Sequence, residues 1–353
     1  MSLNLSLLVF FGMAGVLNYF VTKQFISYAK WKQITDIPTE RSSHTVPTPR
    51  GGGVGFVVTT LALLSCYLIF REPQGVEGSV WMFIIALIII SVLGLFDDRG
   101  GLSKKVRFMV QFLAGLIILI FVHGMDWFYI PFIIDWNFGL LGIPLGLIWI
   151  VGVTNIYNFL DGVNGIATLQ GMVAALAWSL LGWIMNEPLL VVSNVILCGT
   201  LLAFLYYNWT PAKIFMGDAG SVFLGLWFAG MPFWTVSLQQ GMKIGPMIWF
   251  AAILLWPFLF DGSYTIFKRY QNGENVLDAH RSHLYQRLHI AGWTHEKVSS
   301  LYGLFALVCA LAGFLFLYSS EVARLAIFII LFSVSLLFSN YVRRVEQKQQ
   351  ITQ

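Results

Sequence analysis

The sequence NIYNFLDGVNG, residues 155–165, places three amides, one carboxylate and two glycines just after an apolar run. Asn155, Asn158 and Asp161 are three residues apart, so on a helix they share one face about 120° wide. Polar groups at membrane depth are costly and normally face a protein interior or a watery cavity. The stretch therefore predicts a functional site. The alternative is an interfacial loop whose Asn and Gly residues only cap two helices.

The composition around this stretch is that of a membrane protein. Of the 353 residues, 58% are hydrophobic and 11% are charged, and the mean hydropathy is +0.75. These values lie far outside the range of soluble proteins. The three cysteines sit in apolar runs and indicate neither a disulfide framework nor a zinc site. We expect residues 1–353 to form a single integral membrane domain.

Eleven apolar runs are long enough, or nearly so, to span a bilayer, and they predict an all-α, polytopic fold with about eleven transmembrane helices. The runs are 4–22, 54–70, 80–96, 107–123, 139–154, 165–185, 189–207, 220–238, 247–267, 299–319 and 323–342. The first run is not expected to be a cleaved signal peptide, because no basic residue precedes it.

The basic residues predict how these helices are oriented. If odd-numbered helices run from outside to inside, 18 of the 21 Lys and Arg residues fall on one face, and only Arg71, Lys243 and Arg324 fall on the other. The positive-inside rule makes the richer face cytoplasmic, with the N-terminus outside and the C-terminus in the cytoplasm. The net charge of +4 is thus an orientation signal and gives no reason to expect nucleic acid as a partner.

The first two predicted cytoplasmic loops carry candidate groups for phosphate and metal. The run Gly51–Gly53 before a helix exposes backbone N–H groups that favour an anion, with Arg41 and Arg50 adding charge; a flexible loop is the alternative. Asp97 and Asp98 end the third apolar run, where the helix dipole disfavours carboxylates, so a cation should compensate them. Mg²⁺ suits such a site, and pairing with Lys104 or Arg107 is the alternative.

Two later loops on the same face carry similar chemistry. Asp218 opens the eighth run and is placed to cap that helix or to bind a metal, while Gly217 and Gly220 favour phosphate at the helix start. Asp261, within the ninth run, is either a buried polar partner or part of the same cavity. The loop that follows holds His280, Arg281 and His283, which suit phosphate or sugar hydroxyls; a solvated basic loop at the membrane surface is the alternative.

These acidic, glycine-rich and basic loops all fall on the predicted cytoplasmic face. Carboxylates for Mg²⁺, helix starts and basic groups are what phosphoryl transfer requires, because catalysis there is mostly positioning and charge neutralisation. A transporter with intramembrane Asp and Asn residues is the competing class, and it predicts polar residues near the bilayer midplane in helices broken by Gly or Pro.

Five motifs in this order carry a family resemblance: RSSHTVPTPRGGG, GLFDDRGGLSKK, NIYNFLDGVNGIA, FMGDAGSVFLG and HRSHLYQRL. They resemble the polyprenyl-phosphate N-acetylhexosamine-1-phosphate transferases over nearly the whole chain. HRSHLYQRL is more similar to the branch that starts O-antigen chains of lipopolysaccharide, often with 6-deoxy sugars. The CDP-alcohol phosphotransferases are set aside, because their Ala-Arg pair does not follow Asp161-Gly162.

The resemblance implies a reaction at the inner face of the bacterial cytoplasmic membrane. Undecaprenyl phosphate would attack a UDP-N-acetylhexosamine, such as the N-acetylfucosamine or N-acetylquinovosamine form, and UMP would leave. Asp218 would bind Mg²⁺, with Mn²⁺ as the other candidate ion, and a homodimer is left open. The resemblance implies catalytic roles for Asp97, Asp98 and Asp161, and substrate-binding roles for Asn155, Asn158, Lys104, Arg50, His280, Arg281 and His283.

Overall fold

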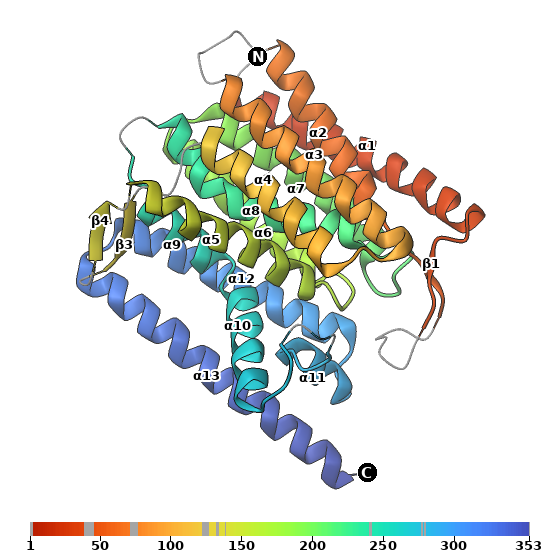
Figure 1. Ribbon diagram of the computed structural model, residues 1–353. Coiled ribbons are helices and arrows are strands. Elements are labelled where there is room, and N and C mark those ends of the chain that lie inside the picture. The colour runs from red at the N-terminus through yellow and green to blue at the C-terminus, as the bar shows by residue number, and fades with distance from the viewer. Residues whose placement is uncertain are drawn as a thin grey trace.

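The structure is a computed structural model that describes residues 3–38, 46–70, 77–121, 127–131, 134–137, 139–239, 242–276, 278 and 280–352. Within them the chain folds into thirteen α-helices and two short β-ribbons (Figure 1). The first seven helices are α1 (Leu3–Trp31), α2 (Gly53–Phe70), α3 (Glu77–Gly100), α4 (Lys104–Phe121), α5 (Gly142–Phe159), α6 (Ile166–Ile184) and α7 (Pro188–Asn208). The remaining six are α8 (Asp218–Leu238), α9 (Ile244–Leu254), α10 (Trp256–Gln271), α11 (Leu284–Ile290), α12 (His295–Tyr318) and α13 (Glu321–Thr352).

Ten of the eleven predicted runs each fall on one helix, the ninth falls on the bent pair α9 and α10, and the all-α polytopic fold is confirmed. In the described part, nine helices are long and apolar enough to cross a membrane, or ten if α9 and α10 together form one span. Among the helices that match a predicted run, α4 is not one of these candidates, because Lys104, Lys105 and Arg107 occupy its first turn and shorten its apolar part. These ten candidate spans together with α4 account for the predicted number of about eleven.

Helix α8 lies at the centre of the bundle. The buried share of its apolar window is 83%, against 17% for α1 and for α13. Its sequence is apolar all round, as expected for a helix surrounded by others, and Trp227 and Trp234 are fully buried on it. Helices α2, α3, α5 and α9 pack around it.

Small residues let two neighbouring helices approach the first turns of α8. A Cβ atom added to Gly53 of α2 would lie 2.3 Å from the Cα atom of Gly220. One added to Gly94 of α3 would lie 2.6 Å from the Cα atom of Ala219. Close backbone approach of this kind is how membrane helices associate without a hydrophobic driving force between them. The end of α8 that carries Asp218 is thereby held against α2 and α3.

The ninth predicted run is broken rather than continuous. Helices α9 and α10 meet at Leu255 with a bend of 80°, and Pro257 stands in the first turn of α10. Proline cannot donate to the preceding turn, so backbone carbonyls are freed at the bend. Gln170 of α6 donates from Nε2 to the carbonyl of Leu254 at 2.9 Å and satisfies one of them. Helix α10 then runs across the bundle toward α11 (Figure 1).

Two antiparallel ribbons were not predicted. Strand β1 (Thr35–Asp36) pairs with β2 (Thr48–Pro49), close to the start of α2, and β3 (Trp127–Ile130) pairs with β4 (Ile134–Asn137). The first ribbon brings Asp36 next to Arg50 and the functional site. Arg41 lies outside the described residues.

We predict that Gly94→Ala destabilises the protein by about 1–3 kcal/mol, because the added methyl group meets the backbone of Asp218 and Ala219 and forces α3 away from α8. Thermal unfolding in detergent measures the change. Gly152→Ala in α5 is the matched control, since nothing lies within 4 Å of its added Cβ atom. Equal unfolding temperatures for the two variants would contradict the packing argument.

Candidate active site

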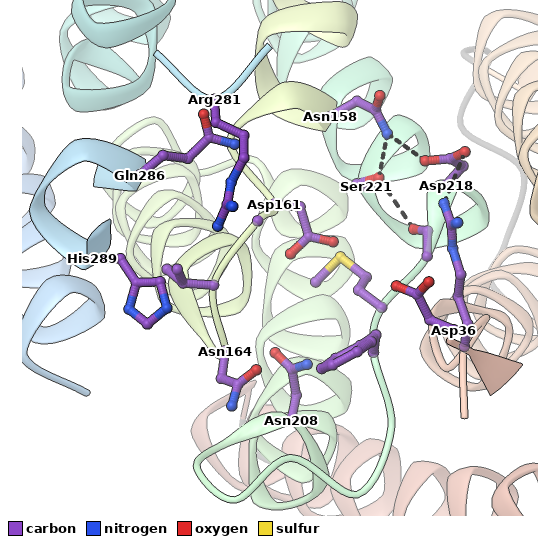
Figure 2. A pocket seen from close by; sticks show the side chains of 16 residues that line it. Asp36, Asn158, Asp161, Asn164, Asn208, Asp218, Ser221, Arg281, Gln286 and His289 are labelled. Carbon is purple, nitrogen blue, oxygen red and sulfur yellow. Dashed lines mark hydrogen bonds and ion pairs between the residues drawn. The ribbon is translucent and has the colours of Figure 1, made fainter. Parts of the chain in front are cut away.

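A polar cavity of about 260 Å³ opens at the end of the bundle where α5 and α7 end and α2 and α8 begin. Figure 2 shows Asp161 between Arg281 on one side and Asp218 on the other. Side chains from five separate segments line the cavity. Its polar residues are Asp36, Arg50, Asn158, Asp161, Asn164, Asn208, Asp218, Ser221, Arg281, Gln286 and His289.

Asp218 is held by groups from two other elements. Its Oδ1 accepts a hydrogen bond from Nδ2 of Asn158 at 2.9 Å, and its Oδ2 lies 3.2 Å from the Arg50 guanidinium. The same Asn158 amide donates to Oγ of Ser221 at 2.7 Å, one turn further along α8. The side chain of Asp218 keeps 19% of its surface exposed, so one carboxylate is both oriented and open to the cavity.

Asp98 caps the start of α8 from the end of α3. Its carboxylate accepts hydrogen bonds from the backbone N–H groups of Asp218 at 2.9 Å and Ala219 at 3.2 Å. Arg50 Nε lies 2.8 Å from the same carboxylate, and the Asp98 side chain is only 2% exposed. The N-terminal dipole of α8 and one arginine therefore supply the positive charge that this helix-end carboxylate requires.

Asp97 is also neutralised by protein groups. It accepts from the backbone N–H of Leu102 at 2.7 Å and pairs with Arg107 at 2.7 Å, with 5% of its side chain exposed. This pairing with Arg107 is the alternative that the sequence left open. Neither Asp97 nor Asp98 lines the cavity, although both interact electrostatically with Asp218.

The two predicted phosphate sites at helix starts are filled by the protein itself. The N–H groups of Gly52 and Gly53 donate to the carbonyls of Phe215 and Met216 at 2.9 and 2.8 Å. At the start of α8, the N–H groups of Asp218 and Ala219 donate to the Asp98 carboxylate. The N–H groups of Gly52, Gly53, Asp218 and Ala219 are therefore not available to a phosphate. These hydrogen bonds join the loops to one another.

The loop of residues 160–165 is fixed from both sides. Oδ1 of Asn208 accepts from the N–H of Gly165 at 2.9 Å, while its Nδ2 donates to the Ile214 carbonyl at 3.1 Å, so one amide ties the loop to the segment before α8. On the other side, a Cβ atom on Gly162 would lie 2.0 Å from the Tyr285 hydroxyl oxygen. Only glycine fits there, and Asp161 is presented to the cavity as a result.

Asp161 is half-buried where it lines the cavity. Desolvation by the surrounding protein raises the pKa of its carboxyl well above the ordinary value. The negative charges of Asp218 and Asp98 raise this pKa further, and Arg50 offsets them only in part. Two carboxyl groups facing one small cavity therefore disfavour each other's ionisation unless a cation joins them.

A second carboxylate, that of Asp261 in α10, holds the start of α11. It accepts from the backbone N–H groups of Leu284 at 2.8 Å and Tyr285 at 3.2 Å. The Tyr302 hydroxyl donates to it at 2.6 Å, and Nδ1 of His283 lies 3.2 Å away. Asp261 and His283 are 1% and 3% exposed, so both are buried partners outside the cavity. These contacts of Asp261 hold α11 in place, so that Arg281, Gln286 and His289 form one wall of the cavity.

Of the predicted site residues, the cavity brings together five: Arg50, Asn158, Asp161, Asp218 and Arg281. Asn155 faces α4 instead, and its amide pairs reciprocally with that of Gln111 at 2.6 and 3.3 Å. It is separated from Asp161 because α5 ends at Phe159, so the assumed helix face does not continue. Lys104 is exposed and pairs with Asp278 at 3.5 Å, and His280 contacts Ser282.

Six polar lining residues were not selected from the sequence: Asp36, Asn164, Asn208, Ser221, Gln286 and His289. Five of them had a signal. Asn164, Asn208 and Ser221 lie in the segments that carry Asp161 and Asp218, Gln286 lies in the HRSHLYQRL motif, and His289 follows Gln286 by three residues, which places both on one helix face. Asp36 had none, because only the β1–β2 pairing brings it beside Arg50.

No group of three or more His, Cys, Asp or Glu side chains among the described residues could hold a metal ion by itself. This agrees with the chemistry of Mg²⁺, which is usually held by one or two carboxylates together with substrate phosphates and water. The open carboxylate of Asp218 and the facing carboxyl of Asp161 are a donor set of that kind.

Comparison with known proteins identifies the family. Residues 80–236 match the family described as glycosyl transferase family 4. A probable undecaprenyl-phosphate N-acetylglucosaminyl 1-phosphate transferase of Bacillus subtilis is 31% identical over 294 residues, covering 82% of this chain and 77% of that protein. The decaprenyl-phosphate N-acetylglucosaminephosphotransferase of Mycobacterium leprae is 29% identical over 316 residues, covering 81% and 77%. The chain belongs to the polyprenyl-phosphate hexosamine-1-phosphate transferases.

A third relative matches a smaller part of the chain. The phospho-N-acetylmuramoyl-pentapeptide-transferase of Streptococcus equi subsp. zooepidemicus is 31% identical over 207 residues, covering 55% of this chain and 60% of that protein. The region matched to the family contains Asp97, Asp161 and Asp218, whereas the α11 wall lies beyond it. Family membership also removes the transporter alternative. The helix break at Pro257 that a transporter would show is present, but Asp261 beside it anchors α11.

We predict that Asp161→Asn stabilises the metal-free protein, and that the gain grows with pH. Because the pKa of Asp161 is raised on folding, the folded state holds a proton that the unfolded state releases above about pH 4. Wild-type stability therefore falls as pH rises from there toward the raised pKa, and the amide removes this loss. Thermal unfolding in EDTA between pH 5 and 8 measures the difference, which a pH-independent offset would contradict.

We also predict that Asp261→Asn loosens the α11 wall. The amide leaves at least one buried donor among Leu284, Tyr285 and Tyr302 without an acceptor, at a cost of about 1–3 kcal/mol. Hydrogen exchange measured by mass spectrometry should accelerate over residues 284–290. Asp278→Asn is the control, because the Asp278 side chain is 61% exposed. An unchanged rate of hydrogen exchange in Asp261→Asn would mean that the contacts of Asp261 do not hold α11.

Proposed function

We propose that this transferase moves an N-acetylhexosamine 1-phosphate from its UDP-sugar to undecaprenyl phosphate, as the first step of O-antigen or other cell-envelope glycan synthesis. A phosphate oxygen of the lipid bonds to the β-phosphorus of the donor. The bond from that phosphorus to the bridging oxygen of the α-phosphate breaks, and UMP leaves. The observation that carries the proposal is one cavity that joins Asp161 and Asp218 to Arg50 and Arg281 in a chain of this family.

The cavity residues divide the work of this reaction. Asp218, oriented by Asn158, would hold Mg²⁺, with Asp161 facing it across the cavity. A Mg²⁺ ion held there would neutralise part of the diphosphate charge. Arg50 and Arg281 supply fixed positive charge from opposite walls, which suits paired phosphate oxygens. We assign Asp98 a positioning role, because its carboxylate orients both Arg50 and the first turn of α8.

The positive-inside pattern supports a cytoplasmic position for this cavity. The loops that line the cavity are those that carry the excess of Lys and Arg. The UDP-sugar that the proposed reaction consumes is a cytoplasmic metabolite. We therefore place the protein in the bacterial inner membrane with this end of the bundle facing the cytoplasm.

The assay for this function follows UMP release by the purified full chain in detergent, with a panel of UDP-sugars. UDP-N-acetylglucosamine comes first because both longer-matching relatives are named for that sugar. UMP should appear only when UDP-sugar, undecaprenyl phosphate and Mg²⁺ are all present. Release of UDP, or of UMP without the lipid, would instead mean a different glycosyl transfer or a hydrolase.

We expect Asp218→Asn to lower turnover about 100-fold or more, because the amide keeps the shape but removes the charge that holds the ion. The unfolding temperature should remain close to that of the wild type. Glu187→Gln is the matched control, since Glu187 lies before α7 at the end opposite to Asn208 and contacts Gln239. An active Asp218→Asn variant would remove the metal role.

A further inference from the structure

Helix α11, which forms one wall of the cavity, is too short to be stable by itself. It has seven residues, whereas isolated helices shorter than about 12–15 residues are marginal in water. Contacts with the rest of the chain must therefore fix its position. Asp261 of α10 binds its first N–H groups. Its last turn is bound from a different helix, α13.

Arg287 in the last turn of α11 pairs with Glu346 of α13. Its Nε donates to Oε1 of Glu346 at 2.7 Å, and its Nη2 donates to Oε2 at 2.5 Å. One edge of the guanidinium thus meets both carboxylate oxygens, and a bidentate pair of this kind fixes direction as well as distance. The two side chains are 23% and 28% exposed, so salt screens this pair less than it screens a fully exposed one.

Other residues near the C-terminal end of α13 pack beside this pair. Helix α13 lies against α11 as it continues toward the C-terminus (Figure 1). Val342 is fully buried there. The ring of Tyr341 meets that of Trp293, which follows α11, edge to face with centroids 6.3 Å apart. The end of α13 therefore supports the end of α11 that Asp261 does not reach.

The position of α11 matters because this wall carries polar groups into the cavity. Gln286 lines the cavity and directly precedes Arg287, so a displacement of Arg287 displaces Gln286 with it. Arg281, at the base of the same wall, faces Asp161 from the side opposite Asp218 (Figure 2). Its guanidinium suits a phosphate group, and the Gln286 amide suits a hydroxyl or carbonyl group. A tilt of α11 about its first turn would change the width of the cavity between these groups and the two acids.

We propose that Glu346 is a positioning residue, which acts through Arg287 to hold the α11 wall at the distance that the nucleotide sugar requires. This proposal rests on the proposed function for the identity of the ligand. Two acids on different helices, Asp261 and Glu346, then hold the two ends of one short helix.

The test is binding to the purified full chain by isothermal titration calorimetry, which needs no turnover. The ligand is UDP-N-acetylglucosamine, or the UDP-sugar of the panel that the wild type binds most tightly. Glu346→Gln keeps the size of the side chain and should raise the Kd about three- to tenfold. Loss of a negative charge alone would attract an anionic ligand more strongly and lower the Kd, so the sign of the change distinguishes the two effects. Gln347→Ala, at an exposed position of the same turn, should keep the wild-type Kd.

A double-mutant cycle tests whether Glu346 acts through Arg287. Arg287→Gln should raise the Kd by a similar factor, and the double variant Arg287→Gln/Glu346→Gln should bind no more weakly than Arg287→Gln alone. Two independent, multiplying effects would mean that Glu346 does not act through Arg287. Hydrogen exchange over residues 284–290 should accelerate in both single variants and not in Gln347→Ala.

The outcomes separate this proposal from the proposed function. A wild-type Kd in Glu346→Gln, even with a lower unfolding temperature, would mean that the pair only stabilises the fold, and it would overturn the proposal while UMP release by the wild type upholds the function. A wild-type chain that binds a UDP-sugar but releases no UMP would refute the proposed function, and a raised Kd in Glu346→Gln would still support the role of Glu346. A wild-type chain that binds no UDP-sugar would refute both.

Discussion

The geometry of the site depends on the contacts that the Asp98 carboxylate makes. It joins the end of α3 to the start of α8, and it holds Arg50 in place between them. A carboxylate at a helix C-terminus is unfavourable on its own, and a helix N-terminus leaves unpaired N–H groups. Bringing the two ends together satisfies both in one contact. Asp218 begins α8 at this point, so its direction into the cavity follows from the same arrangement.

Asp261 repeats this solution on the opposite wall. It stands on α10, just beyond the bend at Leu255, and caps α11 with a carboxylate that also receives the Tyr302 hydroxyl. Both walls of the cavity are therefore set by a buried acid on one helix that binds the first N–H groups of another. Both acids are almost closed to solvent, so they satisfy helix ends that water does not reach.

Between these two walls, Asp161 and Asp218 face a common cavity in which Arg50 compensates their charge only in part. By contrast, Asp97, which pairs with Arg107, lies outside the cavity and keeps only 5% of its side chain exposed. The contrast separates acids that build the site from acids that face a ligand. It also explains why the tight approach of α3 to α8 at Gly94 matters for function: a shift there would move Asp218 relative to Asp161.

The sequence alone determined the membrane class and the position of every long helix, because apolar length is a local property that the bilayer requires. It also pointed to Asp161 and Asp218, because their loops carry charge and glycine beside apolar runs. It could not decide which donors remain available. Whether the N–H groups of Gly52 and Gly53 meet a phosphate or a carbonyl depends on residues 215 and 216, which are more than 160 positions away. Likewise, the contact of His283 with Asp261 depends on how α10 packs against the start of α11. Hydrogen-bond partners are set by tertiary contacts, so the tertiary structure decided which polar residues build the site and which of them line it.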